Sequence, residues 1–155
     1  MHFAAVSILA GALFSGSALA APPAQKEGKK KIEFTDVREQ TVEFIRYYET
    51  IELTSEQEAV KREALSSLPA ACCKSNSAYT CCCICNLSRT VWGLTAYLIT
   101  EHDAGVEEIR DAVQEWTKFV NPAGFSGDSC FKGGCARSFE NNGCGGMQPS
   151  RLIWN

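Results

Sequence analysis

Histidine is almost absent from this chain of 155 residues, which contains only His2 and His102. His2 lies at the extreme N-terminus, and His102 falls in Glu101-His102-Asp103, a run that indicates a solvated turn between two helices. The chain also lacks a C-x-x-C-H haem-attachment motif and a Gly-rich phosphate loop followed by a helix. These absences leave no Ser-His-Asp or Cys-His catalytic set in a convincing context, so we expect a binding protein rather than an enzyme.

An excess of positive charge is missing as well. The chain has 15 Lys and Arg against 18 Asp and Glu, which gives a formal net charge of −3 at pH 7. This balance argues against a nucleic-acid partner, because such proteins carry a basic patch or stripe. After the first 20 residues no apolar run approaches the roughly 20 residues that span a bilayer. We therefore expect no stable membrane insertion of the mature chain.

The first 20 residues contain no Lys, Arg, Asp or Glu and end in Ala18-Leu19-Ala20. An apolar run followed by an A-x-A site is typical of a secretory signal peptide, here with cleavage after Ala20, although no Lys or Arg precedes the apolar run. The domain organisation that we predict is a signal peptide over 1–20, a disordered Pro- and Lys-rich linker over 21–34, and a single helical Cys-rich domain over 35–155. The expected location is the periplasm or the extracellular space.

Apolar residues recur at helical spacing in four segments of the predicted domain. The first helix is expected to begin after Asp36 and the second after Thr54 or Ser55, with Pro69 ending the second. The third is expected over 86–99 and the fourth over 105–120. The predicted fold is mainly α, a small bundle of about four helices with a Cys-rich inter-helix loop, no strand, and an irregular Gly- and Cys-rich C-terminal segment. Gly93, in the middle of the third helix, predicts a close backbone contact.

Six of the nine cysteines fall within 14 consecutive residues of the inter-helix loop. They are Cys72, Cys73, Cys81, Cys82, Cys83 and Cys85, and the C-terminal segment adds Cys130, Cys135 and Cys144. The six cannot all be bare thiolates, since two unit charges about 4 Å apart repel by roughly 4 kcal/mol at an effective dielectric near 20. The thiols must stay protonated, form disulfides, or be neutralised by a metal ion.

A soft metal ion is the first of these solutions. Thiolates select Cu(I), Zn(II) or iron–sulfur centres, and an iron–sulfur cluster is disfavoured because a chain exported unfolded would have to acquire it outside. Neighbouring cysteines point their thiols in several directions, which suits thiolates that bridge more than one metal ion. Cys82–Cys85 lies at the N-terminus of the third predicted helix, where the helix dipole and free N–H groups lower the pKa of a thiol. We predict Cu(I), with Zn(II) second, bound by all six loop cysteines, with Cys130, Cys135 and Cys144 as further candidate ligands. The role would be sequestration, delivery or a structural centre, with a metal-donor or metal-acceptor protein as partner.

Two other classes of function remain open. Cys82-Cys83-Ile84-Cys85 is formally the C-x-x-C of a thiol–disulfide oxidoreductase, although the strand that precedes this motif in thioredoxin-like proteins is not predicted here. Alternatively, disulfides staple a small exported interaction domain, which would explain the three tail cysteines but not three consecutive ones at 81–83. Because nine is an odd number, at least one cysteine has no partner within the chain.

The chain resembles the bacterial exported proteins named for a PCYCGC motif. The likeness lies in the signal segment, in the Leu68-Pro69 step ahead of a cysteine cluster, and in the later Ser129-Cys130-Phe131. The sequence Pro-Cys-Tyr-Cys-Gly-Cys itself is absent. The resemblance implies an exported bacterial Cys-cluster protein and transfers no mechanism.

Overall fold

The computed structural model describes residues 31–154, so the predicted signal peptide and residues 21–30 of the predicted linker lie outside the described residues. The described part contains four α-helices, α1 (Val37–Thr50), α2 (Ser55–Ser66), α3 (Asn86–His102) and α4 (Val106–Val120). Between α2 and α3 lies a two-stranded antiparallel sheet of β1 (Pro69–Ala70) and β2 (Cys73–Ser77). Two short 3-10 helices follow α4, η1 (Ser129–Lys132) and η2 (Gly134–Ala136). The mainly helical fold class is confirmed.

The predicted helix starts are explained by side chains that cap free backbone N–H groups. The Asp36 carboxylate accepts hydrogen bonds from the N–H groups of Arg38 and Glu39 at 2.8 and 2.9 Å, at the start of α1. At the start of α2, Thr54 and Gln57 cap each other's backbone N–H groups in a capping box. The starts of α1 and α2 could be predicted from the sequence, because each capping side chain lies within three residues of the backbone group that it caps.

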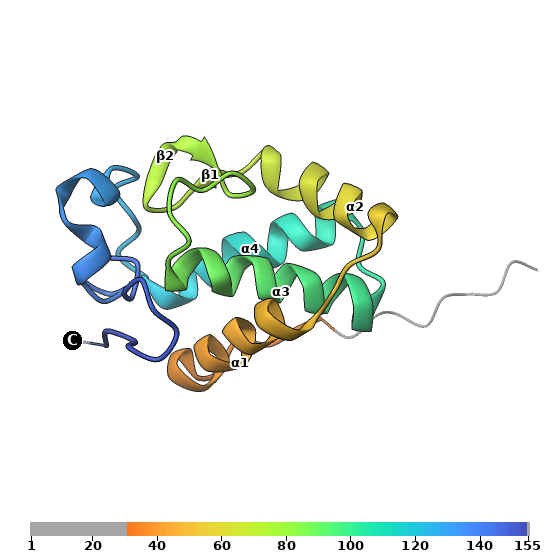
Figure 1. The fold of residues 1–155 in the computed structure, drawn as a ribbon, viewed down its shortest axis with the longest axis horizontal. Coiled ribbons are helices and arrows are strands. Elements are labelled where there is room, and N and C mark those ends of the chain that lie inside the picture. The colour runs from red at the N-terminus through yellow and green to blue at the C-terminus, as the bar shows by residue number, and fades with distance from the viewer. Residues whose placement is uncertain (1–30, 155) are drawn as a thin grey trace, which may run out of the picture.

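Helices α1 and α3 pack against each other, and α2 packs against α4 (Figure 1). The first pair approaches most closely at Gly93, where a Cβ atom, if the residue had one, would lie only 1.7 Å from the carbonyl oxygen of Phe44. The predicted close backbone contact at Gly93 is therefore confirmed. Phe44 and Trp116 meet edge to face in the core, with ring centroids 4.9 Å apart, and the Trp116 indole donates to Thr90 Oγ1 at 3.0 Å.

The small sheet corrects the prediction that the chain has no strand. Pro69 pairs with Ser77 and Ala70 with Cys73, with an irregularity in the register between them. A strand of two residues is too short to show the alternating pattern from which strands are recognised. The sheet orients the first cysteine pair, because Cys73 begins β2 and Cys72 lies just before it.

The C-terminal segment is held against the cysteine loop by backbone hydrogen bonds. The N–H of Cys130 donates to the carbonyl of Cys72 at 3.0 Å, and the N–H of Leu87 donates to the carbonyl of Cys144 at 3.1 Å. The buried Asn86 side chain adds two bonds of 2.9 Å to tail carbonyls. As Figure 1 shows, the tail, the sheet and the first turn of α3 lie together at one end of the molecule.

The folded region begins before α1. Phe34, inside the range predicted as linker, stacks on Phe119 with ring centroids 5.9 Å apart and contacts Trp116 at 5.3 Å. Within residues 31–154, no helix combines the length and the apolar character that crossing a membrane requires.

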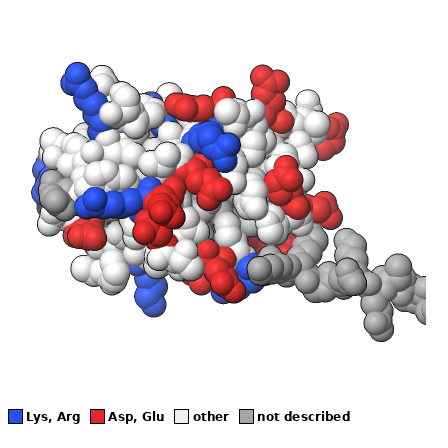
Figure 2. All heavy atoms as spheres, turned by 90° about the horizontal axis from the view of Figure 1, so that it is seen from below, with Lys and Arg blue, Asp and Glu red and all other residues white. Residues whose placement is uncertain are grey.

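Surface charge is unevenly distributed on the face drawn in Figure 2. Acidic side chains dominate the middle and the right of that view, whereas basic side chains are found mainly toward the left, and no continuous basic patch covers the face. The left is also the end at which Figure 1 draws the tail and the sheet. Acidic side chains are thus fewer at the Cys-rich end on this face, which reduces repulsion of any negative metal–thiolate cluster there.

Candidate metal centre

Three cysteines converge at the surface of the Cys-rich end, and we call them the outer triad: Cys82, Cys83 and Cys130. Their Sγ atoms lie 3.5 Å apart for Cys82–Cys83 and 3.3 Å apart for each pair with Cys130. The first two come from the loop that leads into α3, and Cys130 comes from η1. The hydrogen bond between the Cys130 N–H and the Cys72 carbonyl positions η1 beside the turn between β1 and β2. The three thiols form a cluster that can hold a metal ion.

The size of the outer triad fits a thiophilic ion. A triangle with these edges places each sulfur about 2.0 Å from its centre, slightly less than a metal–thiolate bond of about 2.3 Å. An ion bound at that length would sit about 1.2 Å above the plane of the sulfurs, or the thiols would spread by a few tenths of an ångström. Because Cys82 is exposed, the ion would remain accessible to exchange.

The outer thiols are protonated near neutral pH. Partial burial raises the pKa of Cys82 to about 11, and the hydrogen bond with Cys130 adds to the rise. The Cys82 thiol lowers the pKa of Cys130, but contact with Cys83 and partial burial outweigh that effect and bring it to about 11. For Cys83, the lowering by Cys130 is likewise outweighed by burial and by Cys82, and its pKa is also about 11. A metal ion must therefore displace protons from these sulfurs.

Four further cysteines, Cys72, Cys81, Cys85 and Cys144, are electrostatic neighbours, and we call them the inner tetrad. Among residues 31–154, only the outer triad brings three candidate metal-ligand atoms within 4.8 Å of one another. The neighbouring thiols, first that of Cys144 and then those of Cys72 and Cys81, lower the pKa of Cys85, and the backbone N–H of Ser88 adds to the effect. Cys85 is the N-cap of α3, where the positive end of the helix dipole also favours a thiolate. The pKa of Cys72 is raised by its neighbours Cys81 and Cys85, and the pKa of Cys144 is raised first by Cys85.

The remaining two cysteines are Cys73 and Cys135. Cys73 is fully buried, lies in contact with Cys82, and accepts a hydrogen bond of 3.3 Å from the Asn76 side chain. Cys135 is in contact with Cys144 and is an electrostatic neighbour of Cys83 and Cys130. All nine cysteines are free thiols.

The six predicted loop ligands therefore do not form a single local cluster in the structure. Cys82 and Cys83 join Cys130 from the tail, whereas Cys85 neighbours Cys144 as well as Cys72 and Cys81. The C-x-x-C pair is divided, because Cys82 lies beside Cys83 and Cys130, whereas Cys85 is an electrostatic neighbour of the other three members of the inner tetrad. The spacing of the cysteines in the sequence does not predict this division, because the division depends on how the C-terminal tail folds back against the inter-helix loop.

The start of α3 is capped by a cysteine and not by one of the residue types that usually cap helices. Cys85 is the N-cap residue, and its backbone N–H donates to the Ser88 hydroxyl at 3.0 Å. The Asn86 side chain binds the tail instead, so its role is to hold the segment that carries Cys144. Residue type alone did not reveal this, because Asn is common at helix starts for capping.

His102 takes no part in the cysteine groups. It ends α3, which begins with Asn86 just after Cys85, and the 17 residues of this helix span about 25 Å. Its ring lies against Tyr97, with centroids 5.1 Å apart. In the described part of the chain, the convergent candidate ligands are therefore all cysteine sulfurs.

No protein family model matches the chain, and searches of curated proteins and of solved structures give no match either. The resemblance to the PCYCGC-motif proteins therefore stays a prediction from the residues, and function has to be argued from the cysteine site itself.

Proposed function

We propose that this protein is an exported carrier of a soft metal ion, Cu(I) first and Zn(II) second, which it binds through the outer triad. The observation that carries the proposal is the convergence of three sulfurs at 3.3–3.5 Å from segments 47 residues apart in sequence. A purely sulfur donor set excludes hard cations such as Mg²⁺ and Ca²⁺, which take oxygen ligands. A triad without a fourth protein ligand suits Cu(I) better than Zn(II), which is usually tetrahedral.

Exchange with another protein is supported by the exposure of the triad. Cys82 is exposed, and the neighbouring Ile84 and Phe131 are 52% and 73% exposed. Exposed apolar side chains beside a metal site are features of a docking surface. Sequestration or delivery, with a metal-donor or metal-acceptor protein as partner, is therefore the role that we favour.

Location in the periplasm or outside the cell is part of the same proposal. It rests on the sequence pattern of residues 1–20. An exported protein meets oxidising conditions, in which nine free thiols would otherwise form disulfides. A soft metal bound by the outer triad protects its three thiols, because coordination makes their sulfurs less reactive toward oxidants.

The test is an anaerobic Cu(I) titration of the reduced protein against a chromogenic Cu(I) chelator. We expect the wild type to withdraw copper from the chelator, and a Cys82→Ser, Cys130→Ser variant to lose the readily exchanged copper. Ile84→Ser is the matched control, because it changes the same exposed loop and leaves every thiol in place. Equal copper exchange by the double variant and the control would overturn the proposal.

The same preparation separates the alternative functions. A thiol–disulfide oxidoreductase would reduce a disulfide substrate at a rate that depends on both Cys82 and Cys85. A disulfide-stapled interaction domain would contain no metal and would have eight of its nine thiols oxidised when purified from the export compartment.

A further inference from the structure

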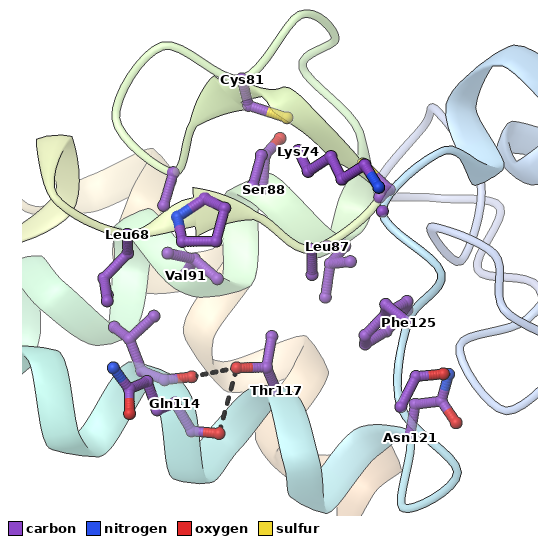
Figure 3. A pocket seen from close by; sticks show the side chains of 18 of the residues that line it. Leu68, Lys74, Cys81, Leu87, Ser88, Val91, Gln114, Thr117, Asn121 and Phe125 are labelled. Carbon is purple, nitrogen blue, oxygen red and sulfur yellow. Dashed lines mark hydrogen bonds between the residues drawn. The ribbon is translucent and has the colours of Figure 1, made fainter.

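A cavity separate from the outer triad lies between the sheet, α3 and α4. Its volume is about 450 Å³, which falls within the range of about 300–1,000 Å³ that small-molecule sites occupy. None of the three triad cysteines is among the residues that line it. Figure 3 shows Lys74 on the sheet side of this cavity and Thr117 on the α4 side. The cavity is therefore a second place at which the protein can hold a ligand.

The walls of the cavity are mainly apolar. Leu87 and Val91 of α3 and Phe125 of the tail are among the side chains that line it, as Figure 3 shows. The lining hydroxyl groups of Ser88 and Thr117 donate to backbone carbonyls of the chain, so their protons are already used. The part of a ligand that this cavity fits is therefore an apolar body, which leaves water when it binds.

The charged side chains at the cavity are all basic. Lys74, in β2, and Lys118, in α4, line it and are exposed, so their ammonium groups lie at its mouth. No Asp or Glu is among the described residues that line it, although the chain as a whole has more acidic than basic residues. Helix α4 keeps its acidic residues off this lining; they are Glu107, Glu108, Asp111 and Glu115. The cavity thus combines an apolar interior with a positive opening.

The tail fixes the position of Lys74. The backbone N–H of Lys74 donates to the carbonyl of Gly127 at 2.7 Å. Gly127 has a φ of +73°, and a Cβ atom there would lie only 3.1 Å from carbons of the Lys74 side chain, so the aliphatic part of that side chain packs directly against the glycine. In the described part of the chain neither Lys74 nor Lys118 forms an ion pair, and Asp128, an electrostatic neighbour of Lys74, pairs with Lys132. Both ammonium groups are available to an anion.

We propose that this cavity binds a small amphipathic carboxylate, with its apolar chain between the sheet, α3 and α4 and its carboxylate at Lys74 and Lys118. Burial of the chain and attraction of the carboxylate to two cations act together on such a ligand. An amphipathic cation would meet like charge at the opening. Binding forms no covalent bond and needs no metal, so this proposal and the proposed metal carriage can fail independently of each other.

Calorimetric titration of the reduced protein with decanoate tests the site. We expect saturable binding of one decanoate per chain, which decyltrimethylammonium, a cation with an apolar chain of the same length, does not displace. Lys74→Gln should weaken decanoate binding by about fivefold, the effect of losing one partly exposed ion pair. Lys132→Gln is the matched control, because it removes the same charge from an exposed side chain that does not line the cavity.

Filling the cavity gives a second, independent readout. Thr117 lines the cavity and is half-buried, so Thr117→Trp introduces an indole at the wall while circular dichroism checks the fold. We expect Thr117→Trp to abolish decanoate binding and Thr117→Ser to retain it.

Four results would overturn the proposal. The wild type would bind no decanoate, Lys74→Gln and Lys132→Gln would have equal affinity for it, or a folded Thr117→Trp protein would bind it as the wild type does. The fourth is a dimer in sedimentation velocity that Thr117→Trp dissociates, because this result would assign the cavity to a second copy of the chain.

Discussion

Replacement of Gly93 by alanine tests the close packing of α3 against α1. A Cβ atom at this position in α3 would lie 1.7 Å from the Phe44 carbonyl oxygen and 2.8 Å from the Tyr48 backbone nitrogen, both in α1. Backbone atoms of a helix cannot turn aside as the end of a side chain can. Since van der Waals contact needs about 3.5 Å, α1 would have to move away from α3 by more than 1 Å.

The net effect on stability is the difference between two terms. Alanine gains about 1 kcal/mol over glycine from helix propensity. Overpacking of a well-filled core costs about 1–3 kcal/mol and sometimes more, and the upper part of this range applies because the clash is with backbone. We expect Gly93→Ala to lower the free energy of unfolding by about 2 kcal/mol, which corresponds to about 8 °C in Tm for a folded region of this size.

Thermal and urea unfolding of the reduced apoprotein, followed by far-ultraviolet circular dichroism, measures this difference. Gly105→Ala is the matched control, because a Cβ atom there has its closest contact at 3.8 Å, with the Glu108 side chain, and the change should cost less than about 1 kcal/mol. A Gly93→Ala protein as stable as the wild type, or more stable, would refute the close approach of α1 and α3.

Three further predictions concern the tail, a tyrosine and an outer-triad thiol. Asn86→Leu should lower the free energy of unfolding by about 3 kcal/mol in urea titrations, because two tail carbonyls lose donors at 2.9 Å; an unchanged midpoint would contradict this. Burial and then the hydrogen bond to Glu43 raise the pKa of Tyr47 to about 12, so its stabilising contribution is complete below pH 10 and is lost as the pH rises through 12. Ultraviolet titration of tyrosinate should therefore show a lower Tyr47 pKa in Glu43→Gln. Burial and the neighbouring thiols bring the pKa of Cys82 to about 11, so its alkylation in the apoprotein should accelerate about tenfold per pH unit up to that pH; a plateau near pH 9 would disprove it.

The helices were predictable because their signals are local. Asp36 and Thr54 cap groups within three residues of themselves, and the apolar residues of α4 recur at helical spacing between Gly105 and Asn121. Gly93 could be flagged for the same reason, since a glycine in mid-helix carries a known cost. The β1–β2 sheet escaped prediction because two paired residues carry no periodicity.

What the sequence by itself determined is a mainly helical, Cys-rich chain whose thiols must be protonated, bridged or bound to metal. Only the tertiary structure decided which thiols meet. Cys82 and Cys83 lie beside Cys130, 47 residues or more along the chain, while Cys85, two residues after Cys83, lies beside Cys144. The cause is the fold of the tail, which backbone hydrogen bonds from Cys130 to Cys72 and from Leu87 to Cys144 hold against the loop. Bonds of this kind use atoms that every residue possesses, so residue types do not reveal them.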